Sequence, residues 1–429
     1  MREISVGNYS RSVSIVGVGC TPWMKILDDP ETVGLTEGEL FGYAALEAME
    51  DAGIEGDKVQ AYFHGQAMPI FSSDYITANV HVADWCGLRG RASYHHSEAC
   101  CTGYVALDLA VQSVASGKYD CVLTGAVDTG DTKFVAGQPA YERKRLEMQD
   151  FLPTVTYVFD RAYTRALEGP MYIGFDDVIA NYSQKYGVSL DDLDDAMNMM
   201  AVNNRYNASK NELALHRTPF EDIAADAGFD DVHEYMKSAY NPKMSDLLRA
   251  SGFEERCEGA AAVIVMPTDM ARDLVGDRAV EVLGCGNSVM ETRTPHWETL
   301  ATQEAVRQAY EVTGVTPDEI DLMLVNDFII ASDLMAAEVA GYLPEGEGWK
   351  YIRDGRTRFD SDRPMNTGGG RTSFGHAHGA SGLADVVEAT RQLRGEAGEH
   401  QVASKPETAL LRGFGGGQNV CVNILRASR

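Results

Sequence analysis

The stretch SEACCTGY at residues 97–104 decides the fold of this chain, because an irregular segment runs there directly into a helix. The helix begins near Thr102 and shows one apolar face, which lasts until Gly117. Cys100 is therefore expected at or just before the first turn, where free backbone N–H groups and the helix dipole favour a thiolate. We predict that Cys100 is a nucleophile. The alternative interpretation is that Cys100 and Cys101 are small buried core residues.

The composition excludes several classes of partner. The chain has 429 residues, 44% of them apolar and 24% charged, which is enough for two or three soluble domains with a sizeable core. Its formal charge of −27 argues against non-specific binding to nucleic acid or to anionic membranes. An anionic ligand would have to be met by a local basic patch. The densest basic cluster, residues 143–145, is interpreted as a solvated face.

The N-terminus and the cysteines indicate a cytoplasmic protein. No apolar run is long enough for a signal peptide or a membrane-spanning helix. The eight cysteines show neither CxxC metal spacing nor the density of a disulfide scaffold, and they stand at positions 20, 86, 100, 101, 121, 257, 285 and 421. We expect reduced thiols and no metal in this chain.

Strands alternate with helices in the first part of the chain. Thr36 and Glu39 have the spacing of a capping box for a helix that ends at Gly53. The other elements expected here are the strands 11–19, 59–65 and 120–125 and the helix that begins near Thr102. This alternation predicts an α/β fold with a parallel sheet covered on both faces.

The same succession returns in the second half. DAGIEGDKVQAYFHG at 51–65 and VTGVTPDEIDLMLVND at 312–327 keep a glycine, an acidic turn and an apolar strand in register. The repeat also contains the elements 279–285, 301–314, 381–395 and 409–413. An internal repeat of this kind predicts two similar domains packed as a pseudo-dimer, with an active site between them.

Residues 128–250 break the alternation and are predicted to be an inserted loop domain with helical stretches at 190–208 and 231–238. The strand-like segment 259–266 then resumes the first domain. The expected boundaries are residues 1–127 plus 251–275 for the N-terminal domain, 128–250 for the insertion and 276–429 for the C-terminal domain.

The loop PMNTGGGRTSFGHAHGASG at 364–382 carries candidate bases. Six glycines in nineteen residues exclude a regular element, so this is a tight loop that presents side chains and backbone N–H groups. His376 and His378 are the candidates, although a lone loop histidine is more often a surface residue. A cysteine with a histidine meets the need of nucleophilic catalysis, because the imidazole takes the thiol proton.

Two further stretches fit the same chemistry. Asn326 and Asp327 end a predicted strand, where an amide can hold a carbonyl or a water, although an asparagine there is often only a turn former. The run GFGGG at 413–417 lets backbone N–H groups approach an oxyanion closely. A flexible turn is the alternative interpretation of this run.

Together the four stretches resemble the thiolase superfamily over nearly the whole chain, which implies a duplicated, layered α/β/α/β/α fold. The family's Cys-x-(Ser/Thr)-Gly matches residues 100–103 and makes Cys100 the acylated residue. Its Asn-x-x-Gly-Gly…Gly-His-Pro loop matches 366–382, with His376 as the base and Ala377 in place of the proline. Its Asn-Glu-Ala-Phe or His-Asp-Cys-Phe segment matches 326–329.

The departures from the family pattern concern the second acid/base. Many thiolases carry a second cysteine where this chain has Gly413, and the archaeal and sterol-carrier-protein-type branch, which this chain resembles, lacks it too. Relatives in that branch often place a cysteine where this chain has Phe328. His378, Cys421 or a bound water are the possible substitutes, and the sequence does not choose among them.

The resemblance implies thiolytic cleavage of a 3-oxoacyl-CoA by coenzyme A through an acyl-cysteine. Asn326 with a water would face the thioester oxygen, and the backbone N–H groups of Cys100 and Gly415 would face the tetrahedral oxyanion. The chain also resembles benzoylsuccinyl-CoA thiolases of anaerobic toluene degradation, which implies cleavage to benzoyl-CoA and succinyl-CoA. The alternatives are a condensing acetyl-CoA acetyltransferase, a retro-aldolase and a non-catalytic acyl-CoA- or lipid-binding protein. The expected partners are a second copy of this chain and a small zinc-ribbon/OB-fold subunit.

Overall fold

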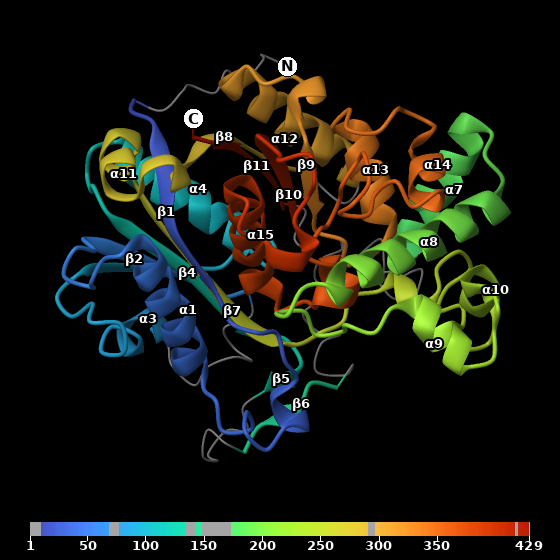
Figure 1. Ribbon diagram of the computed structural model, residues 1–429, viewed down its shortest axis with the longest axis horizontal. Helices are drawn as coiled ribbons and strands as arrows, with labels where there is room; N and C mark the ends of the chain where they lie inside the picture. The colour runs from blue at the N-terminus through green and yellow to red at the C-terminus, as the bar shows by residue number, and fades with distance from the viewer. Residues whose placement is uncertain are drawn as a thin grey trace.

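A single mixed sheet runs through the centre of the molecule. The computed structural model describes residues 10–67, 77–133, 142–147, 173–290, 297–416 and 419–428. The strand order is β3-β2-β4-β7-β1-β8-β11-β10-β9. Figure 1 shows the N-terminal half of this sheet in blue to teal, except for the yellow β7, and the C-terminal half in dark yellow to red. The strands are β1 (Val13–Cys20), β2 (Ala61–Gly65), β3 (Ala92–His96), β4 (Val122–Thr129), β7 (Glu258–Pro267), β8 (Val280–Val289), β9 (Leu322–Val325), β10 (Thr408–Gly415) and β11 (Asn419–Ala427).

The sheet is not parallel throughout, so that expectation is wrong. Parallel pairs occur between β2 and both β3 and β4, and between β9 and β10. The other pairs are antiparallel, including β10 with β11, which follow each other directly. Antiparallel neighbours need no crossover helix, so the alternation of strands with helices along the chain does not reveal them. β1 and β8 join the two halves through three residue pairs, from Val13 with Val282 to Ile15 with Val280.

In each half, one helix packs closely against the innermost strand at a glycine of that strand. α1 (Glu37–Ala52) covers β1, and α12 (Trp297–Thr313) covers β8. A Cβ atom on Gly17 would lie 2.1 Å from the Ala48 carbonyl oxygen, and one on Gly286 would lie 1.9 Å from that of Ala305. Only glycine permits this approach of helix to strand, and its recurrence in both halves is the structural counterpart of the sequence repeat.

The start and the end of α1 are as predicted. Thr36 Oγ1 accepts a hydrogen bond from the Glu39 backbone N–H, and the Glu39 carboxylate accepts one from the Thr36 N–H. Gly53 ends the helix in the left-handed conformation, with a φ of 66°. A second capping box, of Thr316 and Glu319, begins the short 3-10 helix Pro317–Glu319 after α12. Local chemistry therefore sets these boundaries.

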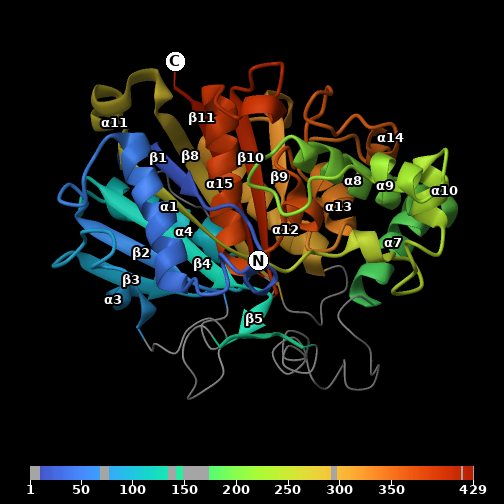
Figure 2. The same ribbon diagram turned by 60° about the horizontal axis from the view of Figure 1, so that its bottom comes forward.

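Two helices form the layer between the halves. α4 (Thr102–Ala115) and α15 (His378–Arg394) pack against each other and against strands of both halves, as Figures 1 and 2 show. They approach most closely at their N-termini, where a Cβ on Gly103 would lie 2.3 Å from the Leu383 nitrogen. A Cβ on Gly382 would lie 2.8 Å from the Tyr104 nitrogen. The Cys100 junction and the loop 364–382, here called the histidine loop, are thereby placed side by side.

The excursion between β4 and β7 packs on the C-terminal half. Its helices α7 and α8 share a hydrophobic cluster with α13 and α14 at the right of Figure 1. The predicted helices at 190–208 and 231–238 correspond to α8 and α10. β7 returns from the excursion to lie between β4 and β1. The helices concerned are α7 (Ile173–Tyr186), α8 (Leu190–Ser209), α9 (Phe220–Asp226), α10 (Val232–Lys237), α13 (Ala331–Val339) and α14 (Gly348–Arg353).

The remaining α-helices and strands of the described residues are peripheral. They are the helices α3 (Ala78–His81) and α11 (Thr268–Val275) and the small hairpin of β5 (Thr132–Lys133) and β6 (Lys144–Arg145). Arg145 of that hairpin pairs with Asp28 and Asp131, so part of the basic cluster is neutralised by carboxylates. Within the described ranges, no helix has the length and apolar character needed to cross a bilayer.

Candidate active site

Cys100 lies immediately before α4, in a turn that its neighbours hold. Thr102 Oγ1 donates to the Ala99 carbonyl at 2.6 Å and accepts from the Glu98 N–H at 2.8 Å. Ala99 adopts a left-handed φ of 48°, and Cys101 is the N-cap of the helix. All eight cysteines lie in the described residues, and Cys100 is the one that is not buried. It is therefore the thiol within reach of a substrate.

The electrostatics of Cys100 differ from the expected thiolate. Although the residue keeps some solvent exposure, the protein around the sulfur desolvates it and raises the pKa of the thiol well above the ordinary value, and the carboxylates of Glu254 and Asp128 raise this pKa further. Arg371 lowers this pKa but does not offset the other effects. Desolvation and two carboxylates thus outweigh the helix N-terminus. Cys100 therefore rests as a neutral thiol, and a thiol in this state needs a base to remove its proton before it can attack a substrate.

His376 is in the protonation state that such a base requires. It is fully buried, and its Nδ1 lies 2.8 Å from Ser381 Oγ. Burial, His378 and Arg371 lower its pKa well below the ordinary value, so the imidazole is neutral. A proton on Nδ1 that donates to Ser381 leaves Nε2 with the free lone pair. The Glu255 carbonyl fixes the loop by accepting from the His376 N–H at 2.7 Å.

Glu254 is the site residue that the sequence analysis missed. Its Oε2 lies 3.3 Å from His376 Nε2, and its Oε1 lies 3.8 Å from His378 Nε2. The two imidazole rings are 4.8 Å apart between centroids. No local motif marks Glu254, because it stands in an irregular segment before β7, far in sequence from both histidines.

The same three side chains have donor atoms within 4.8 Å of one another, a spacing that could accommodate a metal ion. His378, the first residue of α15, lies beside His376. No other such group of histidine, cysteine and carboxylate side chains was found in the described ranges.

Asn326 and Gly415 lie on the other side of the Cys100 junction. Asn326 follows β9, is fully buried and donates from Nδ2 to the Phe414 carbonyl at 3.0 Å, while its Oδ1 accepts from the Phe328 N–H. An amide carries two N–H bonds, so a second donor remains on Nδ2. A Cβ on Gly415 would lie 2.7 Å from the Glu98 carbonyl oxygen. The end of β10 therefore presses against the turn that presents Cys100.

The position at which many thiolases carry the second cysteine, Gly413 in this chain, has no room for a side chain. A Cβ on Gly413 would lie 2.2 Å from the ring of Tyr104. Cys421 is also ruled out as an acid/base at this site, because it is fully buried in β11 with its sulfur 3.3 Å from that of Cys285. Of the substitutes considered from the sequence, His378 remains beside His376 and Cys421 does not.

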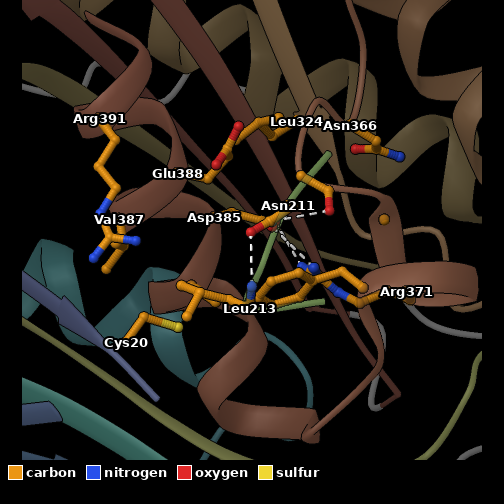
Figure 3. Close-up of a pocket in the computed structure, with 14 residues that line it drawn as sticks. Cys20, Asn211, Leu213, Leu324, Asn366, Arg371, Asp385, Val387, Glu388 and Arg391 are labelled. Atoms are coloured by element: carbon orange, nitrogen blue, oxygen red, sulfur yellow. Dashed lines mark hydrogen bonds and ion pairs between the residues drawn. The ribbon is translucent and has the colours of Figure 1, made fainter. Parts of the chain in front are cut away.

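A buried ion pair supports the histidine loop. Arg371 binds Asp385 at 2.6 and 2.9 Å and donates to the Tyr104 hydroxyl at 3.0 Å. Its charge lowers the pKa of both Cys100 and His376. Figure 3 shows Arg371 and Asp385 beside a cavity of about 20 Å³. This volume suits a water molecule rather than a coenzyme, and neither Cys100 nor His376 lines the cavity.

The match to known proteins extends over both halves. Residues 285–426 match the family model of the thiolase C-terminal domain-like proteins, and residues 57–138 match that of the beta-ketoacyl synthase N-terminal domain. The chain is 30% identical over 421 residues to an acetyl-CoA acetyltransferase of Methanothermobacter thermautotrophicus, covering 96% of this chain and 99% of the relative. It is 26% identical to the benzoylsuccinyl-CoA thiolase subunit BbsB of Thauera aromatica, covering 95% of both chains.

Solved structures show the same fold. The Ltp2-ChsH2(DUF35) aldolase has a TM-score of 0.74 at 21% identity and covers 97% of this chain and 98% of that chain. Human mitochondrial 3-ketoacyl-CoA thiolase in complex with CoA has a TM-score of 0.67 at 16% identity, with coverages of 99% and 100%. Fold and site together define an enzyme of two similar α/β halves, with Cys100 at the junction where α4 and α15 pack together. The chain belongs to the thiolase superfamily, and the predicted fold class and enzyme class are confirmed.

Proposed function

We propose that this chain cleaves a 3-oxoacyl-CoA with coenzyme A, or runs the reverse condensation, through an acyl group on Cys100. The main observation in support is that Cys100, the one cysteine that is not buried, lies where α4 packs against α15. The buried and neutral His376 lies two residues before α15. A resting thiol and a neutral imidazole are the protonation states from which nucleophilic catalysis starts.

The first half-reaction uses these two groups. His376 takes the thiol proton, and the Cys100 sulfur attacks the 3-keto carbon of the substrate. The bond between C2 and C3 then breaks, its electron pair stays on C2, and the acyl group remains on Cys100. In the second half-reaction the sulfur of a coenzyme A attacks this thioester and releases the Cys100 thiol.

Two donor sets would stabilise the charges that develop. The second N–H of Asn326 suits the thioester oxygen that becomes an enolate, and the backbone N–H groups of Cys100 and Gly415 suit the tetrahedral oxyanion. The contact of the end of β10 with the Cys100 turn supports the pairing of these N–H groups. Removal of one such donor typically costs about 2.7–4 kcal/mol of barrier.

The test uses acetoacetyl-CoA and coenzyme A as probes. Cys100→Ser is expected to lose cleavage by more than about 1,000-fold, since the hydroxyl is a far weaker nucleophile at neutral pH. Mass spectrometry of the native chain mixed with acetoacetyl-CoA should find an acetyl group on the peptide that contains Cys100. Unchanged CoA-dependent cleavage by Cys100→Ser would refute the mechanism, and CoA-independent cleavage would favour the retro-aldolase alternative.

For the acyl group, we propose 2-benzoylsuccinyl-CoA as the substrate to compare with acetoacetyl-CoA. The 26% identity to the Thauera aromatica subunit supports this choice. The insertion also contains aromatic residues between positions 151 and 172 that are compatible with an aromatic acyl group, and these lie outside the described residues. Phe328 is buried between Phe175 and Phe414, with ring centroids at 5.1 and 5.2 Å, so its ring is part of the core. A higher kcat/KM for acetoacetyl-CoA would decide for the acetyltransferase relatives.

We also propose a homodimer in the cytoplasm that binds a small zinc-ribbon/OB-fold subunit. The two-protein name of the Ltp2-ChsH2(DUF35) structure and the subunit name of the Thauera aromatica relative support such a partner. Light scattering of the purified chain, alone and after co-expression with a small zinc-ribbon/OB-fold protein, gives the stoichiometry. A monomer in both cases would contradict the proposal.

A further inference from the structure

We propose that Glu254 is the second acid/base of the reaction, the group that gives a proton to C2 of the leaving acyl-CoA and takes one from the incoming thiol. This inference rests on the proposed thiolase reaction, and its test has a separate readout.

The backbone threads Glu254 between the two motif segments. Its N–H donates to the Phe328 carbonyl at 2.9 Å, and Phe253 bridges to Ile329 in a strand-like pair. One residue further on, the Glu255 carbonyl holds the His376 N–H at 2.7 Å. Glu254 is thus fixed beside the residue at which related chains carry a thiol, and also beside the histidine loop.

The carboxylate points into the reactive side of the site. His376 Nδ1 is engaged by Ser381, so the 3.3 Å contact of Glu254 Oε2 is with the nitrogen that handles protons. Glu254 Oε1 lies 3.8 Å from His378 Nε2, so the carboxylate stands between the two imidazoles. After burial, Glu254 makes the largest contribution to the raised pKa of Cys100, so it lies within electrostatic range of the sulfur.

Glu254 is more exposed to substrate than the other candidates for the second acid/base. Its side chain is 19% exposed, whereas that of His376 is 0% and that of His378 is 3% exposed. The position of the usual second cysteine is filled by the Tyr104 ring, and Cys421 lies within the sheet. Glu254 is therefore the partly exposed proton carrier that touches the base.

The proton balance closes with these groups alone. In the first half-reaction the Cys100 proton passes to His376 and then to Glu254. When the bond between C2 and C3 breaks, Glu254 gives this proton to C2 and becomes a carboxylate again. In the second half-reaction Glu254 takes the proton of the coenzyme A thiol, and the relay returns it to the sulfur of Cys100 as the acyl group leaves.

The test follows deuterium entry into the methyl group of acetyl-CoA in D₂O, measured by mass spectrometry. The native chain should exchange this position, since the base that removes the C2 proton works without turnover. Glu254→Gln keeps the shape but carries no exchangeable carboxyl proton, and a loss of exchange of about 100- to 10,000-fold is expected. Glu254→Asp should retain part of the rate. Glu255→Gln is the matched control, because the Glu255 side chain faces Lys25 and His216 instead.

Separate readouts distinguish a lost acid/base from a lost site. Glu254→Gln should keep the burst of p-nitrophenol from p-nitrophenyl acetate, because that leaving group needs no acid and Cys100 with His376 is intact. It should also shift the pH profile of Cys100 alkylation to lower pH, since a carboxylate that raises the pKa is gone. If the native chain forms no acyl-Cys100 from acetoacetyl-CoA, the proposed function fails independently of Glu254.

Three results would overturn the role of Glu254. They are exchange by Glu254→Gln within threefold of the native rate, absence of exchange in the native chain, and activity that a chelator removes and Zn²⁺ restores. The last result would make the three side chains a metal site.

Discussion

Replacement of Gly103 by alanine tests whether the contact of α4 with α15 sets the active-site geometry. The added Cβ would lie 2.3 Å from the Leu383 nitrogen and 2.8 Å from the Gly379 carbonyl oxygen. Ordinary contact begins at 3.4 Å, so the two helices would have to separate by about 1 Å (3.4 minus 2.3). Both neighbours are backbone atoms of α15, which cannot rotate away.

This separation would move Cys100 relative to His376, because one precedes each helix. A displacement of about 1 Å at reacting groups can cost about 100-fold in rate, and overpacking of a buried contact costs about 1–3 kcal/mol of stability. We therefore expect Gly103→Ala to lower kcat for acetoacetyl-CoA cleavage about 100-fold and to lower the thermal midpoint. The assays are loss of the acetoacetyl-CoA absorbance and calorimetry.

Gly38→Ala is the matched control. Gly38 is also the second residue of its helix, but the nearest atom to an added Cβ is the Thr36 hydroxyl oxygen at 3.9 Å. Alanine should be neutral or slightly stabilising there, since it has the better helix propensity. If Gly103→Ala kept the native melting temperature and kcat, the inference that this contact positions the two catalytic groups would be refuted.

Three other predictions follow from the environments of single groups. Because its pKa is raised, Cys100 should react with iodoacetamide at pH 7 more slowly than free cysteine and continue to accelerate above pH 9; a plateau near pH 7, read by peptide mapping, would contradict this. His400 lowers the pKa of Glu388 to about 2, while its own pKa is raised. The ion pair therefore contributes fully to the free energy of unfolding between about pH 4.5 and 6.5. Its stabilisation should be lost on the acid side as Glu388 is protonated and on the alkaline side as His400 loses its proton; Glu388→Gln should flatten this pH dependence of the denaturation midpoint. Gly413→Cys should restore no second catalytic thiol and should cost about 1–3 kcal/mol in denaturant unfolding, because its Cβ would meet the Tyr104 ring at 2.2 Å; a variant as stable as the native chain would show that this ring can move.

The sequence by itself determined the elements and the motif residues. Capping at Thr36, the glycine stop at Gly53 and the helix after Cys100 depend on side chains within a few residues, so they can be found in one stretch of the chain. Cys100 and His376 each stand two residues before a helix, α4 and α15 respectively. These predictions hold because turn chemistry and helical periodicity are local.

Only the tertiary structure decided the strand directions, the resting state of the thiol and the place of Glu254. Antiparallel pairing depends on which strands become neighbours after the excursion, and local patterns do not contain that choice. The high pKa of Cys100 arises from burial and from carboxylates distant in sequence, which overcome the effect of the local helix terminus. Glu254 reaches His376 because its segment is threaded between two motif loops, and this proximity exists only once the halves have packed.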